Sequence, residues 1–139
     1  MQKVIITVVI LMFTKLSIGQ TVSIKINDLK NEKGICYVCL FSKSDGFPDN
    51  AKSGVICIKS KINGTFAKTT FIDVTAGTYA ISVFHDENSN GKLDTNFLGI
   101  PKEGYGVSNN NLPKMSKPKF EDAKFILNAD KSLIINIKY

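Results

Sequence analysis

Arginine is absent from this 139-residue chain, and all eighteen of its basic residues are lysine. The planar guanidinium group of arginine is the usual reader of phosphates and base edges, so its absence argues against a nucleic-acid-binding protein. The lysines are also scattered along the chain instead of forming one basic stripe. We therefore expect no nucleic-acid partner.

Residues with catalytic chemistry are scarce. His85 is the only histidine, and no G-x-S-x-G sequence marks a nucleophile elbow. The glycine-rich stretch at 99–106 lacks the GK[ST] of a phosphate-binding loop. A zinc site would need more imidazole or exposed thiol than the polar part of the chain supplies.

Long apolar runs are absent except for ten residues, Val4 to Phe13, which follow Lys3. Ser17 and Gly19 occupy the −3 and −1 positions of a cut before Gln20. This pattern predicts a secretory signal peptide over residues 1–19, and its apolar run is too short to span a bilayer. We expect the mature chain, 20–139, to be exported to the periplasm or beyond, with no transmembrane segment.

The three cysteines lie inside apolar, strand-like runs. Cys36 and Cys39 have C-x-x-C spacing, but residues three apart on a strand point to opposite faces, whereas a redox pair normally opens a helix. We interpret the cysteines as small buried hydrophobes. A disulfide from Cys57 to one of the others remains open in an oxidising compartment.

Strand signals dominate the mature chain, and no stretch longer than about a turn has helical periodicity. Asn63-Gly64 between two strand-like runs indicates a hairpin. The pattern predicts an all-β, single-domain protein, a seven-stranded antiparallel β-sandwich of immunoglobulin-like type with one long irregular loop at about 86–119. The expected strands are 21–28, 35–41, 55–62, 65–74, 78–84, 123–128 and 132–139.

The densest polar cluster follows the strand at 78–84. It reads D-x-N-x-N-G-x-x-D, the first nine positions of an EF-hand-type calcium loop, from Asp86 to Asp94. Alternate side-chain oxygens would converge on one centre, the carbonyl of Lys92 would be the backbone ligand, and glycine at the sixth position permits the sharp turn. Hard oxygen ligands favour calcium. The predicted ligands are Asp86, Asn88, Asn90, Lys92, Asp94 and Glu103.

The match to a calcium loop is incomplete. The twelfth position is Phe97 where a bidentate Glu is usual, and no helices flank the loop. Glu103 or Glu87 could complete the ligand shell. A metal-free turn rich in Asp and Asn is the alternative, because these side chains hydrogen-bond their own backbone.

Two further functions stay open. A small hydrolase or carbohydrate-processing enzyme would use His85, Asp86 and Glu103. A binding module for envelope carbohydrate or protein would present Phe97 and Tyr105, with His85 beside them, as its contact surface.

The block AGTYAISVFHDENSNGKLDTNFLGIPKEGYGVSNN (76–110), with GFP (46–48) upstream and FEDAKF (120–125) downstream, resembles the bacterial domain-of-unknown-function 2141 family. The resemblance covers about residues 21–139. It implies an exported bacterial protein with a transthyretin-like or carboxypeptidase-regulatory-like sandwich, and it implies no known activity. The residues on the family pattern are His85, Asp86, Asn88, Asn90, Gly91, Asp94, Gly99, Pro101, Glu103, Gly104 and Tyr105.

Overall fold

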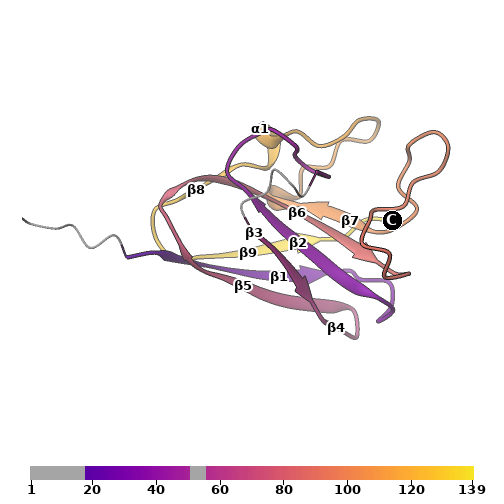
Figure 1. Ribbon diagram of the computed structural model, residues 1–139, viewed down its shortest axis with the longest axis horizontal. Helices are drawn as coiled ribbons and strands as arrows, with labels where there is room; N and C mark the ends of the chain where they lie inside the picture. The colour runs from indigo at the N-terminus through magenta and orange to yellow at the C-terminus, as the bar shows by residue number, and fades with distance from the viewer. Residues whose placement is uncertain (1–17, 51–55) are drawn as a thin grey trace, which may run out of the picture.

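The computed structural model describes residues 18–50 and 56–139, and β-structure dominates it (Figure 1). The all-β class predicted from the sequence is confirmed. The predicted signal peptide lies almost entirely outside the described residues and stays a prediction. The strands are β1 (Gln20–Asn27), β2 (Ile35–Phe41), β3 (Ile56–Ser60), β4 (Ile62–Asn63), β5 (Phe66–Val74), β6 (Gly77–Asp86), β7 (Tyr105–Val107), β8 (Phe125–Leu127) and β9 (Lys131–Asn136).

The strands form two sheets. One has the order β4-β5-β1-β9, and the other has the order β3-β2-β6-β7 with β8 also paired to β6. The prediction of seven antiparallel strands was wrong in two respects. The run expected as one strand at 55–62 is divided into β3 and β4, which belong to different sheets, and β7 lies inside the expected loop. β9 lies parallel to β1, with Ile24 opposite Leu133.

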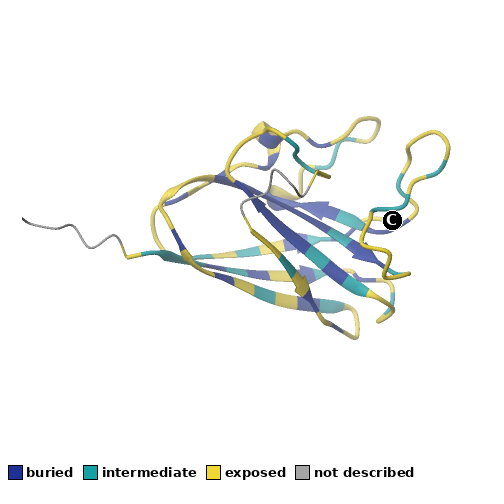
Figure 2. Ribbon diagram, in the orientation of Figure 1, coloured by how far each residue is buried: buried dark blue, intermediate teal, exposed yellow. Residues whose placement is uncertain are grey.

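A shared apolar core lies between the sheets. Val22, Ile24 and Ile26 of β1 face it because successive strand residues alternate between faces, and Val38 and Ile81 meet them from the other sheet. Each of these five side chains is at most 2% exposed, so each contributes about 1.5–3 kcal/mol by burial. Figure 2 shows this alternation along the strands.

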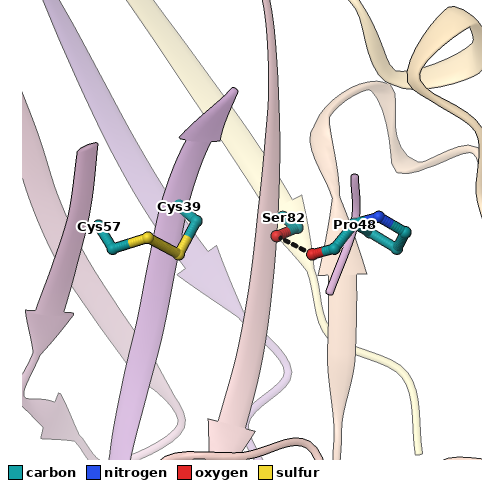
Figure 3. The surroundings of a disulfide bond; sticks show 4 residues. All are labelled: Cys39, Pro48, Cys57 and Ser82. Atoms are coloured by element: carbon teal, nitrogen blue, oxygen red, sulfur yellow. Dashed lines mark hydrogen bonds between the residues drawn. A yellow bond between two sulfur atoms is a disulfide. The ribbon is translucent and has the colours of Figure 1, made fainter. Parts of the chain in front are cut away.

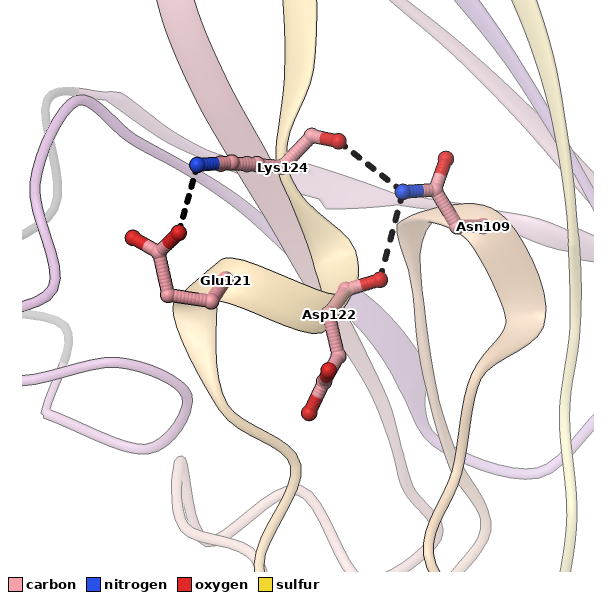
Figure 4. A network of polar contacts seen from close by, with 4 residues as sticks. All are labelled: Asn109, Glu121, Asp122 and Lys124. Carbon is pink, nitrogen blue, oxygen red and sulfur yellow. Dashed lines mark hydrogen bonds and ion pairs between the residues drawn. The ribbon is translucent and has the colours of Figure 1, made fainter.

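A second, smaller cluster covers part of the outer face of the β3-β2-β6-β7 sheet. Phe47 packs edge-on against Phe41 and Phe120, with ring centroids 5.2 and 5.9 Å apart. Phe120 opens the four-residue helix α1 (Phe120–Ala123), which is too short for the sequence pattern to reveal. The side-chain amide of Asn109 donates to the carbonyls of Asp122 and Lys124 and fixes this helix in place (Figure 4).

The expected irregular loop at 86–119 is not continuous. β7 pairs with β6 inside it, with Tyr105 opposite Phe84, and the 3-10 turn η2 (Ser108–Asn110) follows directly. Buried Ser108 donates to the carbonyl of Ala123 at 2.5 Å and accepts from the backbone N–H of Ile81 at 2.9 Å. Within the described residues, no helix is long and apolar enough to cross a bilayer.

Candidate functional site

The polar turn begins at the last residue of β6, Asp86, whose side chain is fully buried. Its carboxylate oxygens accept hydrogen bonds from the backbone N–H groups of Asn90 at 3.1 Å and Gly91 at 2.7 Å. Gly91 has φ +79°, a conformation that favours glycine. The first and sixth positions of the calcium-loop pattern therefore contact each other and fold the turn back on itself.

Three other predicted ligands meet on the solvent side of this turn. The side-chain amide of Asn88 donates to the Asp94 carboxylate at 2.6 Å, and that of Asn90 donates to both carboxylate oxygens at 3.0 and 3.1 Å. The bond from Asn90, followed by that from Asn88, lowers the pKa of Asp94. Lys92 donates its backbone N–H to the side-chain oxygen of Asn90 at 2.9 Å.

Glu103 lies behind the turn and is 5% exposed. One of its carboxylate oxygens accepts from the backbone N–H of Glu87 at 2.9 Å, and the other accepts from that of Asp94 at 3.0 Å. The side chain of Glu87 points elsewhere and accepts from the Asn31 amide at 3.0 Å. Of the two candidates for completing the shell, Glu103 is the one that contacts both ends of the turn.

Carboxylates and other strong ligands do not form a compact cluster here. In the part of the chain that the structure describes, no group of three or more His, Cys, Asp or Glu side chains is placed to hold a metal ion. Oxygen ligation at this turn would therefore depend on the amides of Asn88 and Asn90 as well as on carboxylates.

His85 is fully buried on the opposite face of β6 from Asp86. Its Nε2 lies 2.7 Å from the carbonyl oxygen of Lys33, which can only accept, so Nε2 carries the proton. Its Nδ1 lies 2.6 Å from the hydroxyl of Tyr139, and that hydroxyl oxygen also accepts from the backbone N–H of Lys30 at 2.9 Å. Burial raises the pKa of Tyr139.

The three residues of the hydrolase alternative, His85, Asp86 and Glu103, thus lie near one another in the sequence and the fold. Each is at most 5% exposed, and every polar side-chain atom of each has a hydrogen-bond partner inside the protein. Their hydrogen bonds connect the end of β6 to the polar turn and to the segments around Lys33 and Tyr139.

Beside the turn, the outer face of the β3-β2-β6-β7 sheet is left uncovered by the Phe47 cluster and forms a groove of about 360 Å³. Three aromatic residues lie in register across its floor, because Tyr37 of β2 is opposite Phe84 of β6, and Phe84 is opposite Tyr105 of β7. The Tyr37 and Phe84 rings stack with centroids 4.9 Å apart and an angle of 4°.

The groove has two walls of different origin. Pro48 and Asp49 line one side, and the polar turn lines the other with Gly91, Lys92 and Thr95. The turn lies next to the floor, since a Cβ placed on Gly91 would be at ordinary van der Waals distance, 3.6 Å, from the Tyr37 hydroxyl oxygen.

A disulfide joins Cys39 to Cys57 (Figure 3). Both cysteines line the groove. The interpretation of the cysteines as small buried hydrophobes is confirmed for Cys36, which is buried and unpaired. The bridge that was left open for Cys57 is present, with Cys39 as its partner. The two residues are directly opposite in the β2–β3 pair, a register that separate inspection of each strand cannot give. Ser82, on the next strand, donates to the Pro48 carbonyl at 2.7 Å and joins the wall to the floor.

Comparison with known proteins agrees with this sequence pattern. A family model described as "Uncharacterized protein conserved in bacteria (DUF2141)" matches residues 24–135. The chain belongs to this family. No curated protein and no solved structure matches it. The DUF2141 family is uncharacterized, so membership assigns no activity to the chain. Its function is inferred from the polar turn and the aromatic groove.

The two aromatic residues predicted to form one contact surface, Phe97 and Tyr105, lie in different places. Tyr105 is half-buried in the groove, whereas Phe97 is 95% exposed and does not line it. Sequence reasoning missed Tyr37 and Phe84 as partners of Tyr105, and it missed Tyr139 as the partner of His85. The aromatic partners could have been found from strand alternation only once the register of β2, β6 and β7 was known.

Proposed function

We propose that this chain is an exported, non-enzymatic binding module that holds a saccharide ring in the aromatic groove. We further propose that one calcium ion bound at the 86–94 turn fixes a wall of that groove. The observation that carries the proposal is the juxtaposition of a groove floored by three aromatic residues in one register row with a turn of calcium-loop spacing.

The composition of the groove suits a sugar. A saccharide ring has an apolar C–H face, which packs on aromatic rings, and an edge of hydroxyl groups, which needs hydrogen-bonding partners. Here apolar surface dominates, while Lys92, Asp49 and Thr95 supply polar groups at the walls. A volume of about 360 Å³ lies within the ordinary range of small-ligand sites.

Calcium is supported by the oxygen groups that the turn brings together. The turn brings the side-chain amides of Asn88 and Asn90 to Asp94, where their nitrogens donate to its carboxylate, and rotation of each amide would present its oxygen to an ion instead. Asp86 accepts from the backbone of the same turn. Hard oxygen ligands suit calcium. The ion would join the Lys92 segment to these side chains, with Glu103 holding the two ends of the turn from behind. Because Gly91 and Lys92 line the groove, a rigid turn gives the groove a fixed width.

The burial of the three candidate catalytic residues favours a non-enzymatic role. A general base or nucleophile must reach the substrate within hydrogen-bonding distance. His85, Asp86 and Glu103 are buried, and each is already bonded to protein groups. The aromatic groove therefore supports binding better than it supports hydrolysis.

The calcium part is tested by calorimetric titration and thermal melting of the chain produced through a bacterial export pathway, with its N-terminus determined by mass spectrometry. A ligand of the native state raises the melting temperature in a concentration-dependent way. We expect Asp94→Asn to weaken calcium binding and the matched, exposed Asp45→Asn in another loop to leave it unchanged. Neither heat nor a melting shift at millimolar calcium would reject the metal.

The saccharide part is tested by tyrosine fluorescence, since the chain has no tryptophan and two of its four tyrosines line the groove. A panel of soluble bacterial and plant polysaccharides serves as the probe. Losing one aromatic contact of about 1–1.5 kcal/mol weakens binding roughly tenfold, so Tyr105→Ala should show this loss. Phe66→Ala, a half-buried aromatic beside two lysines on the other sheet, is the control. Equal losses, or no response to any polysaccharide, would overturn the ligand class.

A further inference from the structure

Three large apolar side chains stand exposed on the short turn that follows the polar cluster. Phe97, Leu98 and Ile100 are 95%, 68% and 56% exposed, and we call them the apolar tip. Single exposed hydrophobes are ordinary, but three within four consecutive positions make a contiguous apolar surface. None of them lines the groove.

The backbone of this turn is held in a defined conformation. The side-chain oxygen of Asn96 accepts from the backbone N–H groups of Leu98 at 2.9 Å and Ile100 at 3.0 Å. The Asn96 backbone bonds to Ile100 and Gly99 at 2.8 and 2.9 Å, and Thr95 pairs with Pro101 below it. The apolar tip is therefore presented outward by hydrogen bonds that a folded-back loop would lose.

Two lysines flank the tip, and three more lie on a second loop. Lys92 and Lys102, both exposed, lie on the two arms of the turn, and both act electrostatically on Asp94. The loop after η2 projects toward the same side of the molecule in Figure 1 and carries Met115, which is 97% exposed. That loop adds exposed Lys114, Lys117 and Lys119, of which Lys117 is paired with Asp49. Residues 92–119 thus hold five lysines against two acidic residues, Asp94 and Glu103.

We propose that this end of the protein docks on an anionic lipid surface, with the apolar tip entering the headgroup region and the lysines contacting lipid phosphates. The apolar turn projects from the protein and carries lysines on both of its arms. It therefore combines the two contributions that bring peripheral proteins to membranes, burial of apolar area and attraction to anionic lipid. A stable protein partner would need about 800 Å² of surface on this side, more than three side chains on one turn offer. The proposal requires neither the groove nor calcium.

Vesicle co-sedimentation of the exported chain tests the proposal. The probes are phosphatidylcholine vesicles with and without about one third phosphatidylglycerol, in EDTA so that calcium cannot bridge protein and lipid. We expect binding to the anionic vesicles at least about tenfold above binding to neutral ones, and a steep loss of binding in high salt because ions screen exposed charges.

Matched triple variants separate the tip from general surface hydrophobicity. Phe97→Ser, Leu98→Ser and Ile100→Ser together should lower vesicle binding about tenfold or more. Ile72→Ser, Ile126→Ser and Ile134→Ser together remove hydrophobes that are 72%, 67% and 57% exposed on strands, and should change binding less than about twofold. Equal binding to neutral and anionic vesicles, or wild-type binding by the tip variant with unchanged melting, would overturn the proposal, as would capture of a protein partner by a chain that does not bind vesicles.

Discussion

Glu103→Gln changes one atom and isolates the role of the buried carboxylate behind the polar turn. In the wild type, both carboxylate oxygens accept backbone N–H groups, from Glu87 and from Asp94. Glutamine has nearly the same shape, but either orientation of its amide places an NH2 group against one of these N–H donors. One charge-assisted hydrogen bond is lost, and two buried donors face each other.

The expected cost follows from those contacts. A hydrogen bond to a charged group contributes about 1.5–3 kcal/mol, and an unsatisfied buried donor adds to the loss, so we expect a decrease of about 3 kcal/mol in the free energy of unfolding. For a domain of this size, that corresponds to a fall of roughly 10 °C in the melting temperature. Urea unfolding followed by circular dichroism measures the free energy, and calorimetry measures the melting temperature.

The measurement is made in EDTA, which separates two roles of Glu103. If the carboxylate acts only as a metal ligand, the variant will match the wild type without calcium. Glu121→Gln is the control, because Glu121 is exposed and its ion pair with Lys124 lies on the surface, where such pairs contribute little. A Glu103→Gln variant as stable in EDTA as Glu121→Gln would refute the argument that Glu103 holds the turn by itself.

Three other predictions follow from individual contacts. Tyr139→Phe should lower the free energy of unfolding by about 1 kcal/mol in a urea titration, because Nδ1 of the buried His85 loses its partner, whereas the exposed N–H of Lys30 can bond to water instead; an unchanged midpoint would contradict the network. Cys57→Ser should cost about 3 kcal/mol, the value for a crosslink across 18 residues, measured against the disulfide-intact chain. Burial raises the pKa of the Cys36 thiol to about 12, so iodoacetamide at pH 8 should label it in urea but not in the native state, as mass spectrometry would show.

The sequence predicted turns and contacts that depend only on residues close together in the chain. A hairpin is present where Asn63-Gly64 indicated one, but its turn is shifted by one residue to Gly64 and Thr65, because Asn63 ends β4 opposite Phe66. Gly64 has φ +66°, a conformation that glycine adopts readily. The contact between Asp86 and Gly91 also belongs to this class, since it spans only five residues. The family was recognised correctly from the 76–110 block.

Contacts between residues on different strands could not be predicted, because they depend on how the strands pair and on where the chain comes back to the same site. Tyr37, Phe84 and Tyr105 come from three strands, and only the pairing of β2, β6 and β7 places them in one row. Tyr139 reaches His85 from 54 residues away, after β9 has returned parallel to β1. The same applies to the disulfide, because strand alternation tells which face a cysteine occupies but not which residue lies opposite it.

The burial of Asp86 and Glu103 explains how an irregular segment can form a wall of the aromatic groove. Carboxylates are costly to bury unless their oxygens are hydrogen-bonded, and here each accepts two backbone N–H groups of the turn. These four hydrogen bonds satisfy backbone N–H groups of the turn that have no neighbouring strand to bond to. Because Gly91 lies next to the Tyr37 hydroxyl and is bonded to Asp86, the buried end of β6 positions this wall. The polar cluster therefore acts through the backbone that it fixes, while Asn88, Asn90 and Asp94 remain on the solvent side, where an ion can reach them.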